Sequence, residues 1–425
     1  MRLLLEAGAD ANFRENGGTS ALMMAASRGH VAVVQSLWEA RADANVKDDH
    51  GRSALMMAAS SGKAQVVRAL LEASDLDEVG DDGRTALMQA ASRGHGEVVR
   101  SLVEAGTDTN LADGALRTAL MIAAARGRAE VVRLLLQANA KVDLIDKDGR
   151  TALIHAASRG HVQVVHALVE GGAHTDLAGT DGRTALMITA VRAHVEVARL
   201  LTEAGADKNL VDNDGRTALM LTASRGHVGV VHLLVEAGVD KDSVDKDGRT
   251  ALMIAALRGH AEVVRVLAEG STEKDLADKD GSTALMIAAT RGDDWVARSL
   301  MEACADKDLV DKVGRSALMR AAARGHVEVV RSLAEAGADK EVVGKDGCKA
   351  LTLAAFHGHA HVVHWLVEAG AANKDFIDLV ARMSLMIQLS VAMLKSFAGR
   401  LKMAAQARWR SCDRRKKKDG LQKRS

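Results

Sequence analysis

The stretch Asp247-Gly-Arg-Thr-Ala-Leu-Met-Ile-Ala-Ala-Leu-Arg-Gly-His-Ala-Glu-Val-Val-Arg-Val-Leu267 determines the fold, because nearly the whole chain consists of copies of it. Successive copies begin 33 residues apart, except for one step of 32 residues between Ser53 and Thr85. Self-similarity at a period of about 20–50 residues indicates stacked repeats, in which each unit buries its apolar face against its neighbours. The copies open at Ser20, Ser53, Thr85, Thr118, Thr151, Thr184, Thr217, Thr250, Thr283, Ser316 and Lys349.

Local signals within one copy predict two short helices joined by a turn. Thr250 is a good residue to cap the first helix, because its hydroxyl can accept a hydrogen bond from an otherwise unpaired amide. Gly259 is expected to end that helix. Val263, Val264 and Leu267 then give a second helix its buried stripe. The following Asp278-Lys-Asp-Gly281 predicts a projecting turn, since Asp and Gly tolerate the dihedral angles that turns require.

Composition restricts what the core can contain. The chain has 425 residues, of which 48% are apolar and only 2% aromatic, with no Tyr and no Pro. The core must therefore consist of Ala, Leu, Val and Met. Residues 381–425 hold 13 Lys and Arg but 2 Asp and Glu, so residues 1–380 carry −10 of the total charge of +1. The repeats are mildly acidic and the C-terminal segment is basic.

The repeated motif Asp-Gly-Arg-Thr-Ala-Leu-Met-x-Ala-Ala-x-x-Gly-His-x-x-Val-Val resembles the ankyrin repeat over about residues 1–381. The family's usual Thr-Pro-Leu-His reads Thr-Ala-Leu-Met in most copies here. The resemblance implies an all-α repeat solenoid of stacked helix pairs with β-hairpin-like fingers, curved with a concave face. It also implies that the chain binds proteins through that face and the finger tips, and that it is not an enzyme.

The repeat pattern predicts four segments. Residues 1–18 match only the end of a copy and are expected to be a truncated repeat. Eleven tandem repeats follow over 19–381, then a degenerate repeat with a capping helix over 382–407, and a basic disordered tail over 408–425. We expect the protein to be a monomer.

The sequence gives no support for metal, cofactor or catalytic sites. The histidines of the recurrent Arg-Gly-His occur once per repeat, about 10 Å apart, whereas metal ligands lie within about 2–2.6 Å of one ion. No Gly-x-Ser-x-Gly, His-Glu-x-x-His or Walker-type motif is present. Three cysteines, Cys304, Cys348 and Cys412, are too few for a disulfide framework. No cofactor is expected.

Candidate partner-binding residues lie where individual copies depart from the repeat. Trp and Arg are enriched where binding energy concentrates, which favours Trp295 and Arg320, and His155 and Phe356 are similar departures. Residues following Thr-Ala-Leu-Met, among them Ile188, Leu221, Ile254 and Ile287, could form the apolar floor of a groove. A series of arginines could form its basic rim: Arg28, Arg93, Arg126, Arg159, Arg192, Arg225, Arg258, Arg291 and Arg324. The alternative is packing between repeats beside a solvated, self-compensating charged face.

The basic C-terminal segment has three interpretations. It is a solvated tail, a nuclear localisation signal at Arg414, Arg415, Lys416, Lys417 and Lys418, or a membrane-surface or calmodulin-type contact through a helix over Val391–Trp409. Nucleic-acid binding is not favoured, because the cluster lacks interleaved aromatic residues. The longest apolar run, Met383 to Leu394, has 12 residues, and a membrane span needs about 20. No secretory signal is visible, so we expect a cytoplasmic protein, with a nuclear one as the alternative.

The function predicted from these observations is a non-catalytic scaffold that binds one or more proteins. Two alternatives remain at the level of sequence. The chain could be the targeting fragment of a larger enzyme or channel, or a recently duplicated repeat array that has no specific partner.

Overall fold

The computed structural model describes residues 8–269 and 273–370, and within them the chain forms 22 helices arranged as eleven pairs. The chain divides into two compact units between Ala251 and Leu252. The predicted all-α architecture of stacked helix pairs is confirmed. The predicted degenerate repeat, capping helix and basic tail lie outside the described residues, as do Arg414 to Lys418, so their roles stay predictions.

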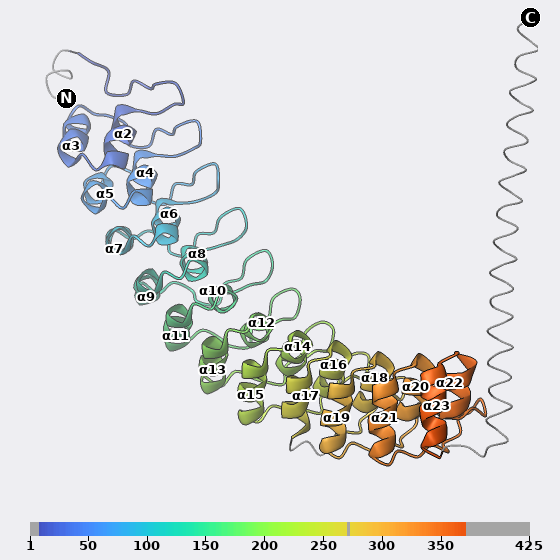
Figure 1. Ribbon diagram of the computed structural model, residues 1–425. Helices are drawn as coiled ribbons and strands as arrows, with labels where there is room; N and C mark the ends of the chain where they lie inside the picture. The colour runs from blue at the N-terminus through green and yellow to red at the C-terminus, as the bar shows by residue number, and fades with distance from the viewer. Residues whose placement is uncertain (1–7, 270–272, 371–425) are drawn as a thin grey trace, which may run out of the picture. The chain divides into compact units, whose positions relative to one another are not determined.

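Unit 1 contains seven helix pairs, and Figure 1 shows their first helices in one row and their second helices in another. The first helices are α2 (Ala21–Arg28), α4 (Ala54–Ser60), α6 (Ala86–Arg93), α8 (Ala119–Ala125), α10 (Ala152–Ala157), α12 (Ala185–Arg192) and α14 (Ala218–Arg225). The second helices are α3 (Val31–Glu39), α5 (Ala64–Leu70), α7 (Gly96–Glu104), α9 (Ala129–Gln137), α11 (Val162–Glu170), α13 (Val195–Glu203) and α15 (Val228–Glu236).

Unit 2 contains four further pairs built in the same way. Its first helices are α16 (Ala251–Arg258), α18 (Ala284–Arg291), α20 (Ala317–Arg324) and α22 (Ala350–Phe356). Its second helices are α17 (Ala261–Ala268), α19 (Asp294–Glu302), α21 (Val327–Glu335) and α23 (Ala360–Glu368). In unit 1, and from α17 onward in unit 2, first helices contact first helices of the next pair, and second helices contact second helices.

The opening Ser or Thr of a copy caps its first helix, as the sequence predicts. The hydroxyl of Thr217 accepts a hydrogen bond from the backbone N–H of Met220 at 3.3 Å, and Thr283 accepts one from Met286 at 3.4 Å. Lys349 cannot accept such a bond, and there the arrangement is reversed. Its backbone N–H donates to the hydroxyl of Thr352 at 3.0 Å.

The 32-residue step between Ser53 and Thr85 is accommodated around the end of the second helix of that copy. Helix α5 has 7 residues, whereas the second helices on either side of it, α3 and α7, have 9 each. The step, however, is only one residue shorter. Ala73 lies 33 residues after Ala40, whereas Asp75, whose N–H binds Asn45 as that of Asp43 binds Asn12, lies 32 residues after Asp43. The residue is therefore missing from the turn after the helix.

In several repeats the histidine of Arg-Gly-His, or its equivalent, links the repeat to the one before it. His326 bonds through Nε2 to the backbone carbonyl of Thr290 at 3.1 Å, and His359 to that of Ala323 at 3.1 Å. The ring lies against the glycine of the preceding Arg-Gly-His or its equivalent, and a Cβ at Gly292 would be 2.3 Å from Nδ1 of His326. These contacts give the histidine a structural role between neighbouring repeats.

One helix ends on a residue poorly suited to its conformation. The residue after a first helix adopts a left-handed conformation, with φ of 83° at Gly94 and 75° at Gly226. Ala193 occupies the same place with φ of 60°. A Cβ in this region costs roughly 1 kcal/mol, so the repeat that contains α12 carries local strain.

Ala193→Gly should therefore raise the free energy of unfolding by about 1 kcal/mol. The matched change in the next repeat, Gly226→Ala, should lower it by a similar amount, because it introduces the strain that Ala193 has. Urea unfolding of the full chain followed by circular dichroism measures both. A stabilising Gly226→Ala would show that this backbone conformation is not costly here.

Candidate functional site

A buried aspartate organises most of the fingers, the projecting turns that precede each first helix. Asp212 is a clear example, with 1% of its side chain exposed. Its Oδ1 accepts backbone N–H groups of Asp214 and Arg216, both at 3.0 Å. Its Oδ2 accepts the Arg216 guanidinium at 3.2 and 2.9 Å. The equivalent buried aspartates are Asp48, Asp113, Asp146, Asp245 and Asp311, and Asp278 is half-buried at the same place.

These bonds favour the ionised aspartate. Burial raises the pKa of Asp212, but the hydrogen bonds from Arg216 and Asp214 outweigh burial, so the pKa lies below its ordinary value of 3.8. The same causes lower the pKa of Asp48 and Asp113. Each finger that has this aspartate is thus held by a carboxylate whose oxygens already bind groups within the fold.

The side chains of His155 and Arg320 also bind a buried finger aspartate. Each occupies the place that the arginine of the finger, such as Arg216, takes beside Asp212. His155 lies 2.7 Å from Oδ2 of Asp146 through its Nε2, with 16% of its side chain exposed. Burial lowers the pKa of His155, against the opposing effect of its bond to Asp146. The side chain is therefore kept mainly neutral at pH 7 and donates to the carboxylate. Its predicted contact with a partner stays untested.

Arg320 joins two fingers. Its guanidinium binds Oδ2 of Asp311 at 2.6 Å and donates to the hydroxyl of Ser282 in the preceding finger at 2.8 Å. Ser282 stands where other fingers carry an arginine such as Arg249. Arg320 therefore supplies from the next repeat a cation that this finger lacks.

The residues predicted to form an apolar floor are mostly buried. Leu221 is 4% exposed, Ile254 7% and Ile287 9%, and only Ile188 is half-buried. These side chains fill the interior of the first-helix row. Their burial fits the packing interpretation, and their predicted contact with a partner stays untested.

Trp295 and Phe356 are exposed. Trp295 lies near the start of α19 and is 67% exposed, as its place in the repeat predicts. Phe356, the last residue of α22, is 65% exposed and meets the ring of His357 edge-on at 5.2 Å. Both are available for contact, and their binding roles remain predictions.

The structure reveals a further surface that sequence reasoning missed. An aliphatic residue directly before the buried aspartate, or before the residue that replaces it, is about half exposed in six fingers. We name these the finger aliphatics: Val79, Ile145, Val211, Val244, Val310 and Val343. The signal was present in the sequence, because an apolar residue recurs there among polar ones at the repeat period.

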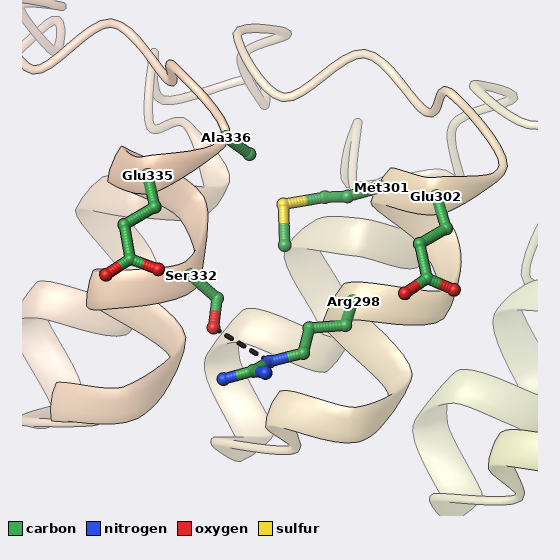
Figure 2. Close-up of a pocket in the computed structure, with 6 residues that line it drawn as sticks. All are labelled: Arg298, Met301, Glu302, Ser332, Glu335 and Ala336. Carbon is green, nitrogen blue, oxygen red and sulfur yellow. Dashed lines mark hydrogen bonds between the residues drawn. The ribbon is translucent and has the colours of Figure 1, made fainter.

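A surface hollow lies between α19 and α21 in unit 2, with a volume of ≈ 320 Å³. Figure 2 shows Arg298 reaching across it to Ser332, whose hydroxyl is 3.1 Å from Nε, while the carboxylates of Glu302 and Glu335 stand on either side. Ser332 in turn donates to Asp294 at 2.6 Å. Arg298 and Ser332 thus bind each other and Asp294, and the residues drawn in Figure 2 as lining the hollow include no histidine to activate the serine.

Within residues 8–269 and 273–370, no three His, Cys, Asp or Glu side chains converge as metal ligands would. Among these same residues, no helix is both long and apolar enough to cross a bilayer.

A family model for three ankyrin repeats matches residues 1–79, 33–113, 87–178, 171–245, 219–311 and 285–378, which together span most of the chain. The chain belongs to the ankyrin repeat family. Ankyrin repeats generally mediate protein–protein interactions, and the family is typically non-catalytic. A comparison with curated proteins found no match.

In this ankyrin repeat protein, Arg320→Ile should lower the free energy of unfolding by about 1–3 kcal/mol, since Asp311 and Ser282 both lose a charged partner. Adding Ser282→Arg should recover part of that loss, because the new arginine can bind Asp278 as Arg249 binds Asp245. Urea unfolding of the single and double variants measures the effect. A double variant less stable than Arg320→Ile would contradict this account of the fingers.

Acid should remove the contribution of ionised Asp212 to the free energy of unfolding. Because its pKa is lowered in the folded state, this contribution is present above about pH 4 and is lost as the pH falls through the folded-state pKa. Asp212→Asn should cost about 2–4 kcal/mol at pH 7 and much less near pH 2. Urea unfolding at both pH values measures the gap between variant and wild type. A gap of equal size at both would rule out ionisation of Asp212 as its origin.

Proposed function

We propose that this ankyrin repeat protein is a non-catalytic scaffold that binds partner proteins along its fingers and its row of first helices. The finger aliphatics are the observation that carries the proposal. In unit 1, Val79, Ile145, Val211 and Val244 are 46–55% exposed at the same place in their fingers. Aliphatic side chains aligned at one repeated place on a surface suit an interaction site.

The fingers are also held in fixed positions, which supports the proposal. Backbone N–H groups of one finger donate to carbonyls of the preceding one, as from Thr180 to Asp148 at 2.9 Å and from Lys246 to Asp214 at 3.2 Å. A preorganised surface loses little conformational entropy when it binds. The finger aliphatics can therefore contribute to affinity without a folding step.

Replacing Val211 and Val244 together by Ser tests this function. Immobilised full-length protein should recover one or more proteins from a cell extract, and we expect the double variant to recover at least one of them about tenfold less. Both side chains are half exposed, so the variant should keep its fold, which circular dichroism verifies. Quantitative mass spectrometry of the captured proteins is the measurement.

Val162→Ser is the matched control, since Val162 is exposed at the start of the second helix α11, away from the fingers. Trp295→Ala is a separate test of the predicted contact at α19. Unchanged recovery of every protein by the finger variant would exclude the finger aliphatics as the binding surface.

A further inference from the structure

Five consecutive repeats of unit 1 place an arginine at the end of the first helix or within two residues after it. We name them the arginine row: Arg93, Arg126, Arg159, Arg192 and Arg225. All five are exposed. Because each occupies the same position in its repeat, they follow one edge of the first-helix row at intervals of about 10 Å, the usual distance between packed helices.

None of these five side chains has an ion pair or hydrogen bond to another side chain among the described residues. The finger arginines of unit 1 differ, since Arg117 and Arg216 bind buried finger aspartates at 2.7 and 2.9 Å. Acidic residues at the starts of second helices bind other arginines. Glu97 pairs with Arg68 at 3.2 Å, and Glu196 lies 3.9 Å from Arg199.

The helix dipole accounts for only part of this arrangement. A cation at a helix C-terminus is stabilised by roughly 0.3–1 kcal/mol, and any basic residue would serve. A guanidinium also offers five N–H donors arranged for two-point binding of a carboxylate. Along the arginine row those donors face solvent in five successive repeats.

The charge and the spacing favour a polypeptide with discrete carboxylates. An extended chain advances about 3.3 Å per residue, so an acidic residue at every third position would match the intervals of the row. A nucleic acid strand carries a phosphate every 3.4 Å or so in a duplex. Most of its charges would then face repeats whose sequence is net negative.

The surface beside the row fits a chain lying close to it. The residues just before the five arginines are small or of moderate size: Ser92, Ala125, Ser158, Val191 and Ser224. None is aromatic, and stacking on aromatic side chains is what single-stranded nucleic acids use.

We propose that the arginine row binds an extended acidic segment of a partner protein, with Asp or Glu at about every third residue. This inference rests on the proposed scaffold function and specifies the partner's chemistry. Two-point contacts from successive arginines would hold the segment parallel to the row of first helices.

The test uses the full chain and a fluorescein-labelled peptide of eighteen residues, about three residues for each interval and its flanks, with Glu at every third position and Ser or Ala between. Fluorescence anisotropy at low and moderate salt gives its dissociation constant. The variant Arg126→Gln, Arg159→Gln and Arg192→Gln should weaken binding at least tenfold. Exposed, unpaired side chains tolerate such changes, and circular dichroism verifies folding.

The matched control is Arg100→Gln, Arg133→Gln and Arg199→Gln, which removes the same charge from exposed positions on the second helices α7, α9 and α13. We expect it to weaken binding less than twofold. Equal weakening by both variants would mean that only net charge matters and would overturn the inference, as would a peptide that does not bind.

Two further outcomes separate the explanations. A single-stranded RNA of equal charge that binds more tightly than the peptide, and loses affinity in the arginine-row variant, would assign the row to nucleic acid and overturn the inference. If capture of proteins depends on Val211 and Val244 while the peptide shows no dependence on the row, the scaffold function stands and the acidic-segment inference fails.

Discussion

Within each unit, a helix pair buries its apolar side chains against its neighbouring pairs, and the rest of the structure depends on that contact between repeats. The first helices approach one another through alanines such as Ala255 and Ala288, which have 0% exposure. Small side chains allow close approach, so a chain with almost no aromatic residues can still be densely packed. Stability then becomes approximately a sum of repeat and interface contributions.

The fingers depend on a second constraint. Most contain a buried carboxylate, which must accept hydrogen bonds from backbone N–H groups and a cationic side chain. Where the aspartate is absent, as at Gly179, the finger arginine Arg183 turns to Asp212 of the next finger at 3.4 Å. Where the arginine is absent, as at Ser282, the guanidinium of Arg320 from the next repeat donates to the hydroxyl of Ser282. Departures from the repeat are thus compensated between neighbours, because an unpaired buried charge costs more than a single altered contact.

Much of the fold could be predicted from the sequence, because period, caps and helix ends depend on residues within one copy. Thr217, for example, caps a helix that begins at the next residue. The candidate site was less predictable. Arg320 resembled an exposed binding residue because its partner Ser282 lies 38 positions away. Leu221 resembled a groove floor because only packing against neighbouring repeats shows that it is buried.

The same reasoning separates residues that build the scaffold from residues available for binding. Asp212 has every carboxylate oxygen occupied, so a partner would have to break internal bonds to use it. Val211, directly before it, is 52% exposed and contributes little that folding requires. Neighbouring residues of one finger therefore serve opposite purposes. Arginines divide likewise, since Arg216 is committed to Asp212 while Arg225, at the end of the helix that follows, has its guanidinium in solvent. A partner can bind such free positions without any change in the contacts that hold the repeats together.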